Sequence, residues 1–136
     1  MAGKLKSPKA EQGSRIRASD SSSGTSQLMR PKFCLEHLQK EHCISKCTLE
    51  EKAAFADRIH EMSQLTWQQL SQAHRHKQGF ESIDRGSIKG SFPSVLTQDV
   101  TILAFRFSGL APMVGFRTGE VFHVVWFDRA FNLYKH

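Results

Sequence analysis

The chain has 136 residues, enough for one domain of ordinary size and too few for two. Hydrophobic residues make up 39% and charged residues 24%, a globular balance, and no apolar run reaches the roughly 18–20 residues of a membrane-spanning helix. The N-terminus has lysines but no apolar segment behind them, which argues against a secretory signal and predicts a cytoplasmic protein with no membrane partner.

The formal charge of +6 lies mostly in the first 30 residues, where six Lys and Arg stand against two acidic side chains. Residues 1–28 lack apolar periodicity and are rich in Ser, Gly, Lys and Arg, so we predict a disordered basic tail there. Residues 29–136 are predicted to form a single α+β domain. The tail is either a tethering arm or a segment without function, and the charge permits a nucleic-acid partner without requiring one.

Three cysteines, an odd count, argue against a disulfide framework and for reduced thiols. Cys34, Cys43 and Cys47 have His37 and His42 between them, which raises the question of zinc. Zinc sites usually show two close pairs of ligands, and here the second pair is missing. We therefore predict structural thiols, with no metal and no cofactor.

The first elements are a short strand and two helices. Alternation around residues 33–37 predicts the strand. Thr48 and Glu51 form the capping-box pattern that begins a helix, and residues spaced by three and four give that helix one apolar stripe through Phe55, Arg58 and Met62. Thr66 and Gln69 repeat the capping pattern at a second, shorter helix, which is expected to continue the core.

A polar stretch follows the second helix and contains His74, Arg75, His76 and Lys77. Two histidines and two cations suit phosphate contact, acid–base chemistry or half a metal site. A solvated loop, where cations suit the C-terminal end of a helix, explains the same residues. Residues 80–90 show little periodicity and are predicted to be loop.

Three segments with a period of two follow, at 101–107, 112–117 and 120–127, and the turns between them are short enough for hairpins. They predict an antiparallel meander. The predicted fold class is therefore α+β, in the order β-α-α-β-β-β, with two helices packed on one face of a small antiparallel sheet.

The predicted turns fix a register, and the register divides the sheet into two faces. A turn at Thr118 and Gly119 places His123 on the apolar face under the helices, as a core histidine, unless a one-residue bulge moves it. The other face is expected to be half-exposed and to present Arg106, Arg117, Phe122 and Trp126.

Guanidinium groups grip phosphates, and the two aromatic residues of that face are suited to stacking on a base. The plainer alternative pairs Arg117 with Glu120 across the hairpin and leaves Arg106 extended along the surface.

The element order, together with the segments 105–107, 114–117, 123–128 and 132–136, resembles the RelE/ParE superfamily of bacterial toxins over roughly residues 31–136. Ribonuclease members cut messenger RNA on the ribosome without a metal, and ParE-like members act on DNA gyrase. The resemblance implies RNA or the ribosome as substrate and an antitoxin protein as partner.

Carried over by position, the resemblance implies that Arg106 and Arg117 hold the scissile phosphate. Tyr134 or His136 would then polarise the 2′-hydroxyl or protonate the leaving oxygen, because histidine as a residue type titrates near neutral pH. Two other functions stay open: a toxin-like module that binds a protein without catalysis, and a small nucleic-acid-binding domain.

Overall fold

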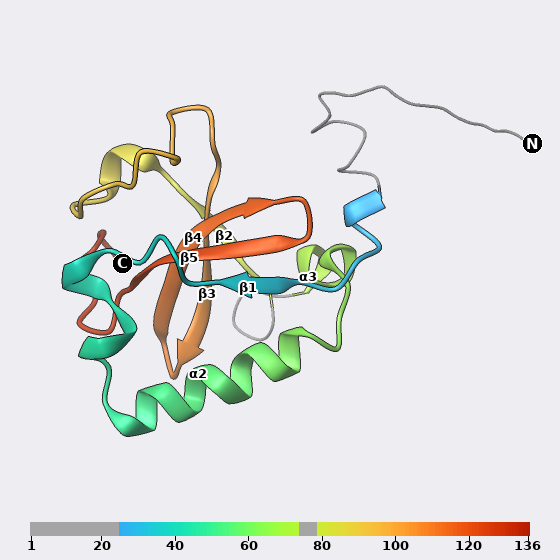
Figure 1. Ribbon diagram of the computed structural model, residues 1–136, viewed down its shortest axis with the longest axis horizontal. Helices are drawn as coiled ribbons and strands as arrows, with labels where there is room; N and C mark the ends of the chain where they lie inside the picture. The colour runs from blue at the N-terminus through green and yellow to red at the C-terminus, as the bar shows by residue number, and fades with distance from the viewer. Residues whose placement is uncertain (1–24, 74–78) are drawn as a thin grey trace, which may run out of the picture.

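The computed structural model describes residues 25–73 and 79–136. In chain order the helices and strands are β1 (Lys32–Cys34), α2 (Leu49–Met62), α3 (Trp67–Gln72), β2 (Glu81–Ile83), β3 (Ile102–Ser108), β4 (Ala111–Thr118) and β5 (Val121–Phe127), with three short 3₁₀ turns, η1 (Lys40–His42), η2 (Ile44–Lys46) and η3 (Arg85–Ser87). The predicted α+β class is confirmed, with helices packed on a small sheet (Figure 1).

The sheet has five strands in the order β1-β5-β4-β3-β2. Strand β1 runs parallel to β5, whereas the other pairs are antiparallel, so the sheet is mixed rather than purely antiparallel. Strand β2 lies in the segment expected to be loop. With only three residues it is too short to show periodicity, and it joins the sheet through its backbone pairing with β3. Both edge strands are three residues long, which limits pairing with other chains.

Both helices begin at the predicted capping boxes. Thr48 accepts a hydrogen bond from the Glu51 amide at 3.1 Å, and the Glu51 carboxylate accepts one from the Thr48 amide at 2.8 Å. Thr66 and Gln69 repeat this exchange at 3.2 and 2.9 Å. Two further amides of the first turn of α3 donate to the backbone oxygens of residues 29 and 27, so this helix start has partners from the N-terminal segment.

The helices cover one face of the sheet, as Figure 1 shows for α2. The core of this side, which we call the helix-side core, joins both helices to β3, β4 and β5 through Phe55, Met62, Trp67, Leu70, Leu103, Phe105, Phe107, Met113, Phe122, Val124 and Phe127. Arg58 completes the α2 stripe, and its Nε donates to the backbone oxygen of Arg106 at 2.8 Å.

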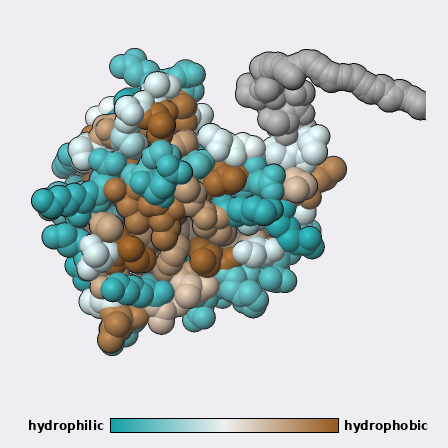
Figure 2. Space-filling model, in the orientation of Figure 1, coloured by the Kyte–Doolittle hydropathy of each residue, from teal (hydrophilic) through white to brown (hydrophobic). Residues whose placement is uncertain are grey.

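The opposite face is covered as well, which corrects the expectation of a half-exposed sheet. A second core lies there between the strands, the loop after β2 and the C-terminal segment, and includes Ile88, Leu96, Ile102, Ala104, Val114, Phe116, Val125, Trp126, Leu133 and Tyr134. In Figure 1 that loop lies on the side of the sheet away from α2. The face seen in Figure 2 has hydrophobic residues over the region of β1 and the β4–β5 hairpin, with hydrophilic residues around them.

The predicted register is wrong at both hairpins. The β4–β5 turn is Gly119 and Glu120, so Thr118 pairs with Val121 rather than Arg117 with Glu120. The β3–β4 turn has two residues instead of four, with a register shift between Arg106 and Ser108. At the β4–β5 hairpin the pairing moves by two residues, which leaves the faces unchanged. The shift between Arg106 and Ser108 is one residue, and it moves the preceding side chains of β3 to the other face relative to β4.

A second irregularity lies between β4 and β5, where Gly115 pairs with Val124 but Val114 pairs with Trp126. The extra residue, Val125, is a β-bulge. Because of it, Val124 and Phe127 both face the helices although they are an odd number of residues apart.

The described part of the expected tail packs on the domain. Ser26 is buried, and both Ser26 and Gln27 bond to Arg117. The boundary predicted at residue 28 is therefore too late for these residues, while residues 1–24 lie outside the described part.

Candidate functional site

An open cleft lies where the C-terminal segment meets the β2 edge of the sheet, with a volume of about 380 Å³. Its lining comes from three places: β2 and the turn after it, β3, and the last three residues, as Glu81, Ser82, Ile83, Asp84, Ser87, Arg106, Tyr134, Lys135 and His136. Three of the four predicted catalytic residues, Arg106, Tyr134 and His136, thus meet in one place. This volume is in the range of small-ligand sites.

Arg106 reaches the cleft from β3, beside the register shift that precedes Ser108. Bulges commonly redirect a side chain next to a binding site. The backbone of Arg106 is held by Arg58, but within residues 25–73 and 79–136 no hydrogen bond or ion pair ends on its guanidinium. A half-buried guanidinium with all its donors available is an anchor for an anion such as phosphate.

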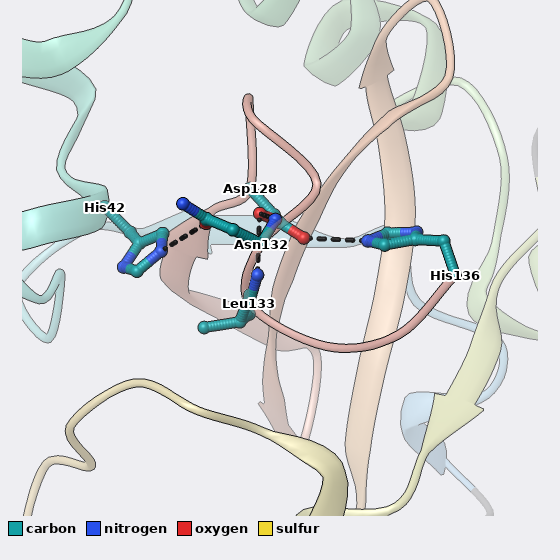
Figure 3. Close-up of polar contacts among 5 residues, drawn as sticks. All are labelled: His42, Asp128, Asn132, Leu133 and His136. Atoms are coloured by element: carbon teal, nitrogen blue, oxygen red, sulfur yellow. Dashed lines mark hydrogen bonds and ion pairs between the residues drawn. The ribbon is translucent and has the colours of Figure 1, made fainter.

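His136 is oriented by Asp128, a carboxylate with no exposed surface. Its Nε2 lies 2.8 Å from Asp128 Oδ2, while Asp128 Oδ1 accepts the backbone amides of Asn132 at 2.9 Å and Leu133 at 3.0 Å (Figure 3). A carboxylate only accepts, so Nε2 is the donor of this pair and Nδ1 of a neutral imidazole is left to accept a proton. The pair has the parts of a general base with its orienting carboxylate.

Tyr134 supports the imidazole from the side. The two rings stack at 4.1 Å between centroids with 28° between planes, and Tyr134 is 6% exposed. Leu133, next to Tyr134, is fully buried. Its backbone oxygen accepts a hydrogen bond from the Lys89 amide at 2.8 Å, which ties the C-terminal segment to the loop after β2. Leu133 and Tyr134 are therefore part of the second core, and His136 is held next to them by Asp128 and the Tyr134 ring.

The cleft carries both signs of charge. Lys135 and Arg106 supply positive charge, and Glu81 and Asp84 line the same space with carboxylates. Ser82 and Ser87 add hydroxyl groups. This mixture suits a ligand that has an anionic group and hydrogen-bond donors, as a nucleotide has.

Arg117, predicted to share a face with Arg106, lies on the opposite face. Its Nε donates to the Gly119 oxygen at 2.6 Å, its Nη1 to Gln27 Oε1 at 2.6 Å and its Nη2 to Ser26 Oγ at 2.9 Å. Its Cζ lies 4.1 Å from the centroid of the Trp67 ring, and burial lowers the pKa of its guanidinium. The predicted pairing with Glu120 is also wrong, since Glu120 binds Lys32 at 2.6 Å.

Phe122 and Trp126 do not form a stacking surface. Both have no exposed area, and the bulge at Val125 places them on opposite sides of the sheet. Trp126 Nε1 donates to the Ser91 oxygen at 3.1 Å, so its polar atom is occupied too. The predicted nucleic-acid residues His74, Arg75, His76 and Lys77 lie outside the described residues.

His123 faces away from the helices, so its placement in the helix-side core is wrong. Its ring stacks on Phe116 at 4.6 Å and lies 5.5 Å from the His37 ring, and its Nε2 is 2.7 Å from Thr118 Oγ1. Burial, and next the neighbouring His37, lower the pKa of His123, while the nearby Glu36 acts in the other direction. Its Nδ1 is buried and has no hydrogen-bond partner.

The three cysteines are free thiols. Among the described residues no group of three or more His, Cys, Asp or Glu is arranged to hold a metal ion. The described helices also include none with the length and apolar character needed to cross a membrane.

Asp128 is the residue of the cleft region that sequence reasoning missed. It follows the last strand as one carboxylate in a charged-looking segment, and no pattern marks it as buried. The available signal was local: an Asp directly after a strand, five residues before the start of a buried Leu-Tyr pair, accepts backbone amides in a tight turn. In comparisons with family models, curated proteins and solved structures, nothing matches this chain.

Proposed function

We propose that this chain is an endoribonuclease, a RelE-like toxin of a toxin–antitoxin system that cuts messenger RNA without needing a metal. The observation that carries the proposal is the meeting of Arg106, whose guanidinium has no partner among the described residues, with the Asp128–His136 pair and Tyr134 at one open cleft. The α+β architecture and the sequence resemblance support the assignment to a toxin. Arg117 takes no part, because it is bound on the other side of the sheet.

These groups supply what RNA cleavage requires, since RNA carries its own nucleophile. The 2′-oxygen attacks the adjacent phosphorus while Nδ1 of His136 takes the 2′-hydroxyl proton. The bond from phosphorus to the 5′-oxygen breaks, and the Tyr134 hydroxyl gives a proton to that oxygen. The products are a 2′,3′-cyclic phosphate and a 5′-hydroxyl, and Arg106 stabilises the charge that develops on the phosphate oxygens.

The test is cleavage of a DNA oligonucleotide that contains a single ribonucleotide, with the purified full chain in buffer with EDTA and, separately, on messenger RNA bound to ribosomes. Wild type should leave a cyclic phosphate at the ribonucleotide. Arg106→Ala should lose about 10²–10³-fold in rate and His136→Ala about 10²–10⁴-fold. Tyr134→Phe tests the proton donor.

Lys52→Ala is the matched control, because Lys52 is an exposed cation on α2, on the other side of the sheet. The same variants are then induced in a bacterial host, where the wild type and the control should arrest growth and Arg106→Ala should not. Equal cleavage by wild type and by both the Arg106 and His136 variants would refute the proposed site.

A second candidate is a phosphate-binding or nucleic-acid-binding domain without catalysis. The observation in its favour is that Arg106 and Lys135 line one cleft and have no ionic partner within the described residues. Salt-dependent binding that Arg106→Ala abolishes, without cleavage of any RNA, would select it. Growth arrest without RNA cleavage would instead select a toxin-like module that acts on a protein such as gyrase.

A further inference from the structure

Phe131 combines exposure with a strained backbone. It is 45% exposed, and with a φ of +57° it is the one non-glycine residue with positive φ in the described part of the chain. A side chain with a Cβ is disfavoured in this region, and a bulky aromatic residue especially so. Strain of this kind tends to persist at functional sites, where the surrounding structure enforces it.

Two anchors enforce it here. Asp128 accepts the amides of Asn132 and Leu133 immediately after Phe131, as Figure 3 shows. Two residues before Phe131, Arg129 Nε donates to Glu51 Oε1 at 2.7 Å, which ties the turn to the start of α2. These contacts hold the chain on both sides of Phe131, whose side chain is exposed.

The ring also has a specific position. Its centroid lies 5.1 Å from that of His136 with 81° between planes, and the His136 ring also stacks on Tyr134. Phe131 therefore borders the imidazole that we assign as the general base. Proteins that bind single-stranded nucleic acid combine a positively charged groove with aromatic side chains on which bases stack, because every base has a π-face.

We propose that Phe131 is a stacking platform for the nucleobase of the nucleotide next to the scissile phosphate of single-stranded RNA. The inference rests on the proposed function for its substrate and deepens it by adding a base subsite. Stacking is tolerant of base identity, so the subsite contributes affinity and positions the strand rather than reading its sequence. In this arrangement the base lies on Phe131 and its sugar–phosphate reaches His136 and Arg106.

The test uses the full chain and two single-stranded probes with 2-aminopurine at successive positions. One is an oligoribonucleotide, and the other is the same sequence with 2′-deoxyriboses, which this chemistry cannot cut. Stacking quenches 2-aminopurine fluorescence. Wild type and Phe131→Trp should quench it and bind alike, whereas Phe131→Leu should lose the quenching and weaken binding about 10-fold, the effect of removing one stacked base.

Phe131→Gly separates a functional role from a structural one. Glycine accepts positive φ at no steric cost, so this variant should bind as poorly as Phe131→Leu while its Tm stays equal to or rises above that of wild type. A residue kept for packing would lower the Tm instead. Leu49→Ala is the control, an exposed apolar residue at the start of α2, and should change neither quantity.

The outcomes keep the two proposals apart. If the wild type cleaves RNA and Phe131→Leu binds and cleaves it equally well, the stacking platform is refuted and the ribonuclease proposal stands. Quenching that depends on Phe131 without any RNA cleavage leaves the platform and overturns the ribonuclease. Binding within about two-fold of wild type for Phe131→Leu would refute the inference.

Discussion

Arg106 and Arg117 lie on neighbouring strands of the same sheet, yet their guanidinium groups have opposite surroundings. Arg117 uses its Nε, Nη1 and Nη2 atoms on groups of the protein and rests on the Trp67 ring. Arg106 has no such partner in the described residues and lines the cleft. The Arg117 guanidinium stabilises the fold, and the Arg106 guanidinium is available to a ligand.

The comparison shows that the face of the sheet, rather than the residue type, decides what an arginine does. Side chains alternate along a strand, so two arginines on adjacent strands share a face only in one parity of register. The observed register places Arg117 with Phe122 on the helix side and Arg106 with Pro112 on the other. The register shift between Arg106 and Ser108 produces this separation.

Breaking the register should have the largest effect. A Cβ on Gly115 would lie 1.8 Å from the backbone oxygen of His123, so Gly115→Ala cannot keep the close approach of β4 and β5 at the bulge. We expect a loss of more than about 3 kcal/mol in the free energy of unfolding, measured by urea denaturation followed by circular dichroism.

Gly109→Ala is the control for that substitution. Gly109 has a φ of +57° and no atom within 4 Å of the added Cβ, so only backbone strain of about 1 kcal/mol should appear. If both alanine variants lose the same stability, steric closeness at Gly115 is not what holds the register.

The two arginines should next separate in stability. Arg117→Ala removes three hydrogen bonds and a cation–π contact, and we expect a loss of about 2 kcal/mol. Arg106→Ala should stay within about 0.5 kcal/mol of wild type, as for a surface substitution. Urea denaturation of both variants at one pH measures the difference.

Arg117→Lys is the matched variant, because it keeps the charge but not the guanidinium fork, and it should recover only part of the loss. At low urea, where it remains folded, Arg117→Lys should still cleave RNA at the wild-type rate if the ribonuclease proposal holds. A stability loss at Arg106 equal to that at Arg117 would remove the distinction drawn between the two faces.

The helices were predictable because their signals are local. Each capping box sets four consecutive residues, and the stripe through Phe55 and Met62 depends only on spacing along one element. The face of each strand was not predictable, because a one-residue register shift such as the one between Arg106 and Ser108 reverses the side chains beyond it. A bulge such as Val125 leaves no mark in a run of apolar residues, so nothing in 121–127 shows where the alternation breaks.

The cleft shows the same limit. Arg106, Tyr134 and His136 were predicted as catalytic residues by resemblance, and the structure brings them together through contacts across the sheet that periodicity does not contain. Strand β2, which forms one wall, has too few residues for a pattern. Asp128, which orients His136, becomes recognisable only once its burial is seen.

The smallest expected effect concerns pH and His123, which lies on the Arg106 side of the sheet near the β4–β5 turn. Burial, and then His37, lower the pKa of His123 in the folded state. The unfolded chain, with an ordinary histidine pKa of about 6.5, therefore binds more protons than the folded chain below that pH. Stability contributed by neutral His123 is fully present above about pH 6.5 and is lost as the pH falls to the lowered folded pKa.

His123→Phe keeps a ring for stacking on Phe116 and removes the titrating group. The Tm of wild type should fall more between pH 7.5 and pH 5.5 than the Tm of this variant does. His37, His60 and the Asp128–His136 pair remain in both proteins, so the difference between the two falls isolates His123. An equal or larger fall in the variant would mean that this part of the Arg106 side responds to acid through another group.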